Sequence, residues 1–324
     1  MAWDDILEQD LAKRIFQTHL ATGRVASAYL LTGPEGVGKR RVAWEMAKAL
    51  NCTAERGRPC DACPLCAQII RGAHPDVHAV SPEGASEQVK IEQIRQVISR
   101  IGLRPYSGAF QVVILEAAER LTEEAANSLL KALEEPPAHT RFLLTTSRLA
   151  HCLPTIVSRC QRIRCQPLPV GAIRQILIDS HACDPQTADA VAPLAGGSAS
   201  AAMDLAKRWT AYHAILTRLA SCESSVWIEQ PLPETRQELV HLLDGMMGWL
   251  RDLAVTATAQ SAPVAHATHE EALRRQASRI DADRCLETAF ELVSLRESME
   301  QFVSPRLIAA LAREKWLSLM ERST

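Results

Sequence analysis

The fold is decided by the stretch Ala28-Tyr29-Leu30-Leu31-Thr32-Gly33-Pro34-Glu35-Gly36-Val37-Gly38-Lys39. A short apolar run leads into a glycine-rich turn, and a helical pattern begins near Arg41. A strand, a glycine-rich loop and a helix in this order form a cradle of backbone N–H groups for a phosphate. Gly33 and Gly38 permit that path, and Lys39 is placed to reach the terminal phosphates. The stretch therefore predicts that this segment derives from a phosphate-binding loop.

Short β-branched and apolar runs alternate with helical patterns on either side of this loop. The runs occupy residues 28–31, 77–80, 112–115, 142–145 and 162–164. Such alternation predicts an α/β domain with a parallel five-stranded sheet and helices on both faces. After Pro167 the strands stop, and two short helices are expected around a break at Gly196-Gly197-Ser198. From about residue 208 the pattern is helical, with apolar residues at 3.6-residue spacing between Leu239 and Leu253. The predicted domains are 1–167, 168–207 and 208–324.

The composition is that of a globular protein, with 47% hydrophobic and 23% charged residues in a chain of 324. No run approaches the roughly 18 consecutive apolar residues of a membrane span. Residues 1–5 include two aspartates where a secretory signal would be basic, so we expect a cytoplasmic protein with no membrane partner. The formal net charge of -2 provides no general attraction to nucleic acid, so any contact with DNA is expected to be shared with partners.

Two positions depart from the requirements of ATP hydrolysis. A working phosphate loop has Ser or Thr after the lysine, because the hydroxyl holds Mg²⁺, and here that residue is Arg40. A second apolar strand should end in Asp-Glu, which hold Mg²⁺ and polarise the attacking water, and here it ends in Glu116 and Ala117. The sequence predicts that hydrolysis is lost or very slow. The binding of ATP or ADP stays open, because the phosphate-contacting residues remain: Gly33, Gly38 and Lys39.

Further strings carry a resemblance to a known family. They are NSLLKALEEPP at residues 127–137, FLLTT at 142–146 and Ser158-Arg159-Cys160. Together with the loop they resemble the clamp-loader branch of the AAA+ ATPases, closely over the first two predicted domains and only as a helical block over the third. The resemblance implies an AAA+ P-loop domain, a small helical lid and an all-α C-terminal collar that joins subunits. In hydrolysing members a sensor arginine stands two residues past the Ser of a Gly-Ser pair, and here that position is Ser200. These losses resemble those of the bacterial loader subunit that does not hydrolyse ATP.

The same resemblance implies a role for Arg159 and a set of partners. In this family the Ser-Arg-Cys arginine enters the neighbouring subunit's nucleotide pocket and stabilises charge on the transferring phosphoryl group. A surface salt bridge is the alternative for Arg159. The implied partners are the gamma/tau and delta subunits of the loader, the beta sliding clamp and primed DNA. The chain would then show no ATPase activity alone, yet belong to the DNA polymerase III holoenzyme, a DNA-directed DNA polymerase and hence a nucleotidyltransferase.

Four cysteines crowd into one short segment that follows the phosphate-loop helix: Cys52, Cys60, Cys63 and Cys66. Two overlapping Cys-x-x-Cys steps let four thiolates converge on one tetrahedral Zn²⁺. With all positions filled by protein, the site would be structural. A redox pair needs only two cysteines in a different fold, and an iron–sulfur cluster also accepts four thiolates. Zinc is the favoured occupant, and His74, which lies near, is expected to be a loop or strand-entry residue.

Two other functions remain as alternatives. An active gamma/tau-type ATPase would have Ser or Thr at position 40 and Asp-Glu at positions 116 and 117. A zinc-dependent DNA-binding protein on an AAA+ scaffold would need a basic surface beside the cysteines. The nearby basic residues form only a modest patch, which is more often a solvated face: Arg56, Arg58 and Arg71.

Overall fold

A computed structural model describes residues 3, 6–55, 57–84, 87–221, 227–228, 231–259, 262–299 and 304–321. Arg56 of the basic patch and all but Trp3 of the acidic start lie outside these residues. The chain divides into two compact units, Met1–Ala172 with Gly197–Ser200, and Ile173–Gly196 with Ala201–Thr324. Among the described residues, no helix combines the length and the apolar character that a membrane span requires. The predicted three-domain division stays a prediction.

The first unit contains the parallel five-stranded sheet that the sequence predicts. Its strands are β1 (Ala28–Thr32), β2 (Val77–Val80), β3 (Gln111–Leu115), β4 (Thr140–Thr146) and β5 (Gln161–Arg164). They lie in the order β2-β3-β4-β1-β5, and every neighbouring pair is parallel. Because parallel strands need crossover connections, helices must cover the sheet, and its central strands are apolar along their length. The predicted fold class is confirmed.

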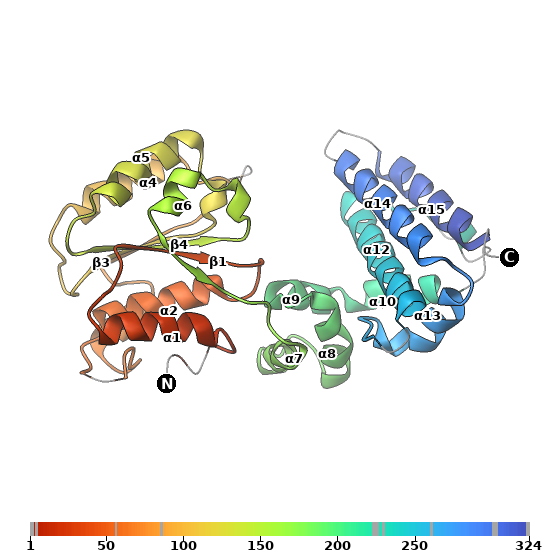
Figure 1. Cartoon of the computed structure of the whole chain (residues 1–324), viewed down its shortest axis with the longest axis horizontal. Coiled ribbons are helices and arrows are strands. Elements are labelled where there is room, and N and C mark those ends of the chain that lie inside the picture. Colours follow the sequence, from red (N-terminus) through yellow and green to blue (C-terminus); the bar gives the residue numbers. More distant parts are fainter. Residues whose placement is uncertain are drawn as a thin grey trace. The chain divides into compact units, whose positions relative to one another are not determined.

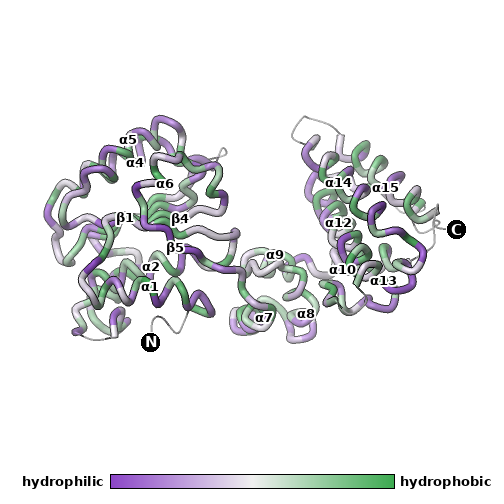
Figure 2. The backbone as a smooth tube through the Cα atoms, viewed as in Figure 1, coloured by the Kyte–Doolittle hydropathy of each residue, from purple (hydrophilic) through white to green (hydrophobic). Residues whose placement is uncertain are grey.

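Helices cover both faces of this sheet (Figure 1). On one face lie α1 (Asp10–Ala21) and α2 (Lys39–Asn51), and on the other α4 (Ile91–Ile101), α5 (Glu123–Glu134) and α6 (Pro154–Ser158). Alternate residues of β1 divide between the two cores: Tyr29 and Leu31 pack with α1 and α2, whereas Leu30 packs with α4 and α5. Figure 2 shows the central strands as a hydrophobic stripe. Both cores hold the strand ends rigidly where the phosphate loop begins.

Shorter elements connect these layers. The segment after α2 carries the cysteines and forms α3 (Pro64–Ile70) before β2 begins. The 3₁₀ turns η2 (Ala118–Arg120) and η3 (Leu149–His151) follow β3 and β4. His74 lies just before β2 and is 4% exposed, which confirms its place at the strand entry.

The described residues beyond β5 contain helices and no strand. They are α7 (Val170–Asp179), α8 (Pro185–Val191), η4 (Ala192–Ala195), α9 (Ala199–Lys207), α10 (Trp209–Ala220), α12 (Arg236–Thr258), η5 (Ala267–His269), α13 (Glu270–Ala277), α14 (Ala282–Ser298) and α15 (Pro305–Glu321). The longest, α12, starts with a capping box in which Thr235 and Glu238 satisfy each other's backbone N–H groups. Its buried residues include the predicted apolar positions from Leu239 to Leu253 except Met247, which is half-buried.

Candidate functional site

The phosphate loop connects β1 to α2 in the predicted strand-loop-helix arrangement. Gly38 is the N-cap of α2 with φ 98°, a left-handed conformation that glycine adopts without strain. A Cβ atom at Gly33 would lie 2.3 Å from the carbonyl oxygen of Cys165, so only glycine fits there. The helix begins at Lys39, two residues before the predicted start. The loop therefore keeps the backbone path of a phosphate cradle.

The Lys39 ammonium is bonded to the loop itself. Its Nζ donates hydrogen bonds to the carbonyl oxygens of Gly33, at 2.7 Å, and Pro34, at 2.5 Å. The residue is 9% exposed, and burial lowers the pKa of its ammonium group. To reach a phosphate, Lys39 would have to give up both carbonyl contacts.

Arg40 and Glu116, the two altered metal-site positions, form an ion pair with each other. The Nε atom of Arg40 lies 2.7 Å from Oε1 of Glu116, whose side chain is 15% exposed. Burial raises the pKa of Glu116, and the positive charge of Arg40 opposes that rise. A guanidinium thus neutralises the carboxylate that would have faced Mg²⁺.

Ala117 stands at the position where a hydrolysing site has its catalytic glutamate. Ala117 has φ 52°, a left-handed conformation that is uncommon outside glycine, and its N–H donates to Oγ1 of Thr145 at 3.1 Å. Two residues on, Glu119 accepts hydrogen bonds from the backbone N–H and hydroxyl of Ser147. Burial would raise the pKa of Glu119, but these donors outweigh it and hold the pKa below its ordinary value. Glu119 is a site residue that sequence reasoning missed.

A second missed residue is Gly36, at the crest of the loop. Its carbonyl oxygen accepts a hydrogen bond of 3.0 Å from the N–H of Ala199, at the start of α9. A Cβ at Gly36 would lie 2.1 Å from the hydroxyl oxygens of both Ser198 and Ser200. The predicted sensor position, Ser200, therefore packs on the loop with no cationic group. A second glycine within the loop was the available signal.

One cavity of about 990 Å³ brings most of the predicted nucleotide positions together. Its lining includes Gly38, Lys39, Arg40, Glu116, Ala117 and Ser200, as well as the missed Gly36 and Glu119. Gly33, Arg159 and the four cysteines do not line it. The structure thus brings most of the predicted nucleotide positions to one cavity and places Arg159 and the four cysteines elsewhere.

Arg159 lies at the C-terminal end of α6 and is folded back onto its own chain. Its guanidinium pairs with the carboxylate of Glu134, in the Leu-Glu-Glu-Pro-Pro string, and Nη1 donates to the carbonyl of Thr155 at 3.0 Å. The side chains of Arg159 and Glu134 are 34% and 48% exposed. Next to it, burial raises the pKa of the Cys160 thiol to about 12, so that thiol is inert at neutral pH.

The four cysteines converge as predicted. The sulfur atoms of Cys52, Cys60, Cys63 and Cys66 all lie within 4.8 Å of one another. Backbone N–H groups point at them: Cys63 N–H donates to the sulfur of Cys60 at 3.3 Å, and Cys66 N–H to that of Cys63 at 3.4 Å. Burial acts to raise the pKa of the Cys63 thiol, but hydrogen bonds from Thr53 and Cys66 outweigh it and bring the pKa to about 6.

This donor set fits a tetrahedral metal ion. Four sulfurs at about 2.3 Å from Zn²⁺ lie roughly 3.8 Å apart, which is inside the observed spread. Two of the cysteines are buried and two are half-buried, so protein would enclose the ion. The segment is also tied to α2, because Lys48 Nζ contacts Asp61 at 2.5 Å and Glu45 at 2.8 Å.

Comparison with known proteins then decides the family. Residues 8–169, half of the chain, match the family described as DNA polymerase III, delta subunit. The chain belongs to this family. The matched residues include the sheet, the phosphate loop, the cysteine segment and Arg159.

Individual DNA polymerase III subunits are identical to this chain at about one third of the aligned residues. The chain is 35% identical over 181 residues to DNA polymerase III subunit delta' of Bacillus subtilis, covering 55% of this chain and 54% of that protein. It is 36% identical over 200 residues to the delta' subunit of Pseudomonas aeruginosa, covering 60% and 58%. The tau subunit of Escherichia coli is 34% identical over 207 residues, covering 62% and 32%. The chain thus spans about half, or less, of the curated relatives it matches.

Among solved structures, the chain resembles a DNA polymerase III gamma subunit-related protein from Thermotoga maritima. The TM-score is 0.44 at 19% identity, with 95% of this chain and 99% of that chain covered.

Proposed function

We propose that this chain is a delta'-type subunit of the bacterial DNA polymerase III clamp loader, which does not hydrolyse ATP and completes the ATPase site of a neighbouring subunit. The loader would place the sliding clamp on primed DNA during replication. Support comes from membership of the DNA polymerase III family together with the altered residues of the phosphate site.

The observation that carries this proposal is the ion pair between Arg40 and Glu116, at 2.7 Å. Hydrolysis of ATP needs Mg²⁺ between the phosphates and the acidic strand end, because the metal neutralises the charge that develops on the phosphoryl group. Here the Arg40 guanidinium stands where the hydroxyl ligand would be, and it already neutralises the carboxylate. A divalent cation would have to displace Arg40 against charge repulsion.

Two further contacts support weak nucleotide binding. Lys39 is bonded to the carbonyls of its own loop, and Gly36 is packed beneath Ser198 and Ser200. A phosphate would have to break the first set of contacts and loosen the second. We therefore expect ATP and ADP to bind poorly compared with an intact phosphate loop.

An ATPase assay of the purified chain with Mg²⁺ tests this. We expect no steady turnover above that of the variant Lys39→Ala, which removes the phosphate-contacting ammonium and so controls for contaminating ATPases. Mg²⁺-dependent turnover that disappears in Lys39→Ala would show a working site and refute the proposal.

We propose that this chain contributes Arg159 to the ATPase site of the neighbouring subunit. The Arg159 guanidinium lies next to the end of α6, and among the described residues it is held by the exposed carboxylate of Glu134, the carbonyl of Thr155 and the hydroxyl of Ser158. In an assembly it would leave Glu134 and stabilise negative charge on the phosphoryl group in transfer. The proposed neighbours are gamma/tau and delta subunits, with the helices of residues 208–324 as the collar and residues 168–207 as the lid.

The cysteine segment is proposed to hold one structural Zn²⁺ through Cys52, Cys60, Cys63 and Cys66. The ion would supply a cross-link between the end of α2 and the start of α3, and no chemistry of ATP. The backbone N–H groups directed at the sulfurs favour the thiolate forms that a metal requires.

The alternative of an active gamma/tau-type ATPase is not favoured, although tau subunits are among the similar proteins. The sequence identity between this chain and the tau subunits is spread over the shared fold, whereas hydrolysis of ATP depends on the residues at positions 40, 116 and 117. The DNA-binding alternative is not favoured either, because the Arg58 guanidinium donates to the carbonyl of Ala54 at 2.5 Å, within its own segment.

A further inference from the structure

The cavity of about 990 Å³ extends beyond the phosphate loop. One end holds the loop and the ion pair described above. The other end lies between α2 and the end of α3, and we call it the α2–α3 groove; its lining includes Arg41, Trp44, Glu45, Lys48, Ile70 and Arg71. The phosphate site accounts for the first end and leaves the α2–α3 groove without a function.

The walls of the α2–α3 groove are fixed by buried contacts. Lys48 is 5% exposed, and its ammonium bridges Glu45 on α2 and Asp61 in the cysteine segment. The α3 wall ends at Gly72, which has φ 67° and donates its N–H to the carbonyl of Ile69 at 3.0 Å. A groove whose walls are held before a ligand arrives loses little conformational freedom on binding.

Three features of the α2–α3 groove are unused by the chain. The guanidinium groups of Arg41 and Arg71 form no hydrogen bond or ion pair with any residue that the structure describes, although burial raises the pKa of the Glu45 carboxyl and the nearby charge of Arg41 opposes that rise. Ile70 is 60% exposed and, like the half-buried Trp44, lines this cavity. The Glu45 side chain is 9% exposed, and its Oε2 atom is buried without a hydrogen-bond partner among the described residues.

We propose that the α2–α3 groove binds a short acidic peptide of a partner protein, in which an apolar side chain stands between carboxylates. The apolar side chain packs on Ile70 and Trp44, the carboxylates pair with Arg41 and Arg71, and a peptide N–H donates to Glu45. Bidentate pairing with carboxylates is what guanidinium groups favour. This inference goes beyond the proposed clamp-loader function and does not depend on it.

The unpaired carboxylate oxygen of Glu45 favours an occupant whose backbone carries N–H donors. A phosphodiester backbone would also satisfy the two arginines, but it has no N–H donor for Oε2, and in a nucleic acid such donors lie on the bases. A peptide backbone presents an N–H at every residue except proline. The chemistry of the groove therefore favours a peptide.

A display library of random twelve-residue peptides, selected on the full chain, tests the proposal. We expect enriched sequences with Asp or Glu on both sides of an apolar residue. A synthetic peptide of the enriched sequence, measured by fluorescence anisotropy, should bind Arg71→Glu about tenfold or more weakly than the unchanged chain, because one attraction becomes a repulsion. Ile70→Ser should also weaken binding, through the lost apolar contact.

The matched control is Arg95→Glu. This exposed arginine lies on α4, on the opposite face of the sheet, so the variant makes the same change of charge outside the groove. Its affinity should equal that of the unchanged chain, and circular dichroism should show all three variants folded. The proposal is refuted if no acidic sequence is enriched, or if Arg71→Glu binds as tightly as Arg95→Glu. Arg71-dependent binding of a (dT)₁₂ oligonucleotide that displaces the peptide would assign the groove to nucleic acid and overturn it as well.

Discussion

At the scale of single residues, two arginines form the ion pairs on which the proposed function rests. Arg40, whose side chain is 70% exposed, pairs with Glu116, whose side chain is 15% exposed. Arg159 is held only at the surface, by Glu134 and neighbouring oxygens. A pair between exposed side chains contributes about 0–1 kcal/mol, so a stronger anion in a neighbouring subunit can take Arg159 from Glu134.

The variant Arg159→Ala tests whether Arg159 acts on the ATPase site of a neighbouring subunit. In a loader reconstituted with gamma or tau and delta subunits, we expect assembly to persist, since the lost contacts are exposed. ATP hydrolysis stimulated by clamp and primed DNA should fall by about 10³-fold or more at the adjoining site, because a trans arginine has effects of that size. Size-exclusion chromatography checks assembly, and steady-state hydrolysis checks the rate. Arg95→Ala serves as control, and unchanged turnover in Arg159→Ala would remove this residue from the mechanism.

At the scale of elements, the cysteine segment depends on its four sulfurs. It is seven residues of helix α3 joined to loops, with few apolar residues to bury, and its cysteines lie within 4.8 Å of one another. Short segments of this kind are commonly held by metal instead of a hydrophobic core. Lys48 then transmits the position of the segment to α2.

The variant Cys63→Ser tests the metal. Elemental analysis of the unchanged chain should find about one zinc per chain, and the variant should lose most of it. A loss of about 3 kcal/mol in the free energy of unfolding would lower the unfolding temperature of a unit of this size by roughly 6–12 °C. Cys183→Ser, outside the segment, should change neither quantity. A metal-free chain of equal stability would contradict a structural site.

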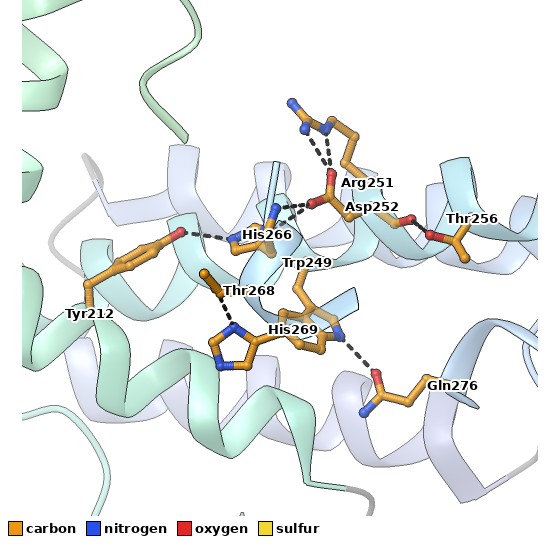
Figure 3. Close-up of polar contacts among 9 residues, drawn as sticks. All are labelled: Tyr212, Trp249, Arg251, Asp252, Thr256, His266, Thr268, His269 and Gln276. Carbon is orange, nitrogen blue, oxygen red and sulfur yellow. Dashed lines mark hydrogen bonds and ion pairs between the residues drawn. The ribbon is translucent and has the colours of Figure 1, made fainter. Parts of the chain in front are cut away.

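In the second unit, helix α12 is joined to the loop before η5 by a buried carboxylate (Figure 3). Asp252 is 0% exposed, and its Oδ2 accepts hydrogen bonds from His266 N–H at 2.8 Å and Nδ1 at 2.7 Å. Arg251 donates to Oδ1, and Tyr212 lies 3.5 Å from the other ring nitrogen of His266. Burial would raise the pKa of Asp252, but these donors outweigh it and hold the pKa below its ordinary value.

The sign of the pH effect follows from this lowered pKa. A carboxyl with a folded-state pKa below its unfolded value of about 3.9 stabilises the fold above that pH. The stabilisation is lost as the pH falls through the folded-state pKa. Asp252→Asn should therefore reduce the free energy of unfolding at pH 7 by roughly 3 kcal/mol and weaken its dependence on pH below about 4.

Urea unfolding followed by tryptophan fluorescence between pH 3 and 7 measures both effects, because Trp249 lies beside His266 in this unit, with ring centroids 5.6 Å apart. Thr258→Val, near the end of the same helix, is a control outside the carboxylate contacts. Equal acid dependence in Asp252→Asn and the unchanged chain would show that Asp252 does not supply the effect.

At the scale of the whole molecule, sequence reasoning predicted the class of fold, with a parallel five-stranded sheet followed by helices. The order of strands and helices follows from local patterns, namely apolar runs, glycine-rich turns and 3.6-residue spacing, and these lie within single segments. The helix start at Lys39 differed by two residues from the expected position, since Gly38 caps the helix through its left-handed backbone. Element ends depend on such capping geometry, which apolar spacing does not report.

The candidate site was only partly accessible from the sequence. The altered positions 40, 116, 117 and 200 were recognised because each belongs to a motif with fixed spacing. Glu119 and Gly36 were missed, because their importance lies in contacts with Ser147 and Ala199, far away in the chain. The four cysteines were found together because their spacing is short.

The sequence by itself determined that the chain has a strand, a glycine-rich loop and a helix in order, has Arg40, Glu116 and Ala117 at the altered motif positions and carries four closely spaced cysteines. These properties depend on residue identity at local spacing. Only the tertiary structure decided that Arg40 pairs with Glu116, that Lys39 bonds to its own loop and that α2 and α3 enclose a groove with unpaired charges. The physical reason is that ion pairs, cavities and unsatisfied groups form where segments distant in the sequence pack together. The packing of the whole sheet and its helices decides which segments are in contact.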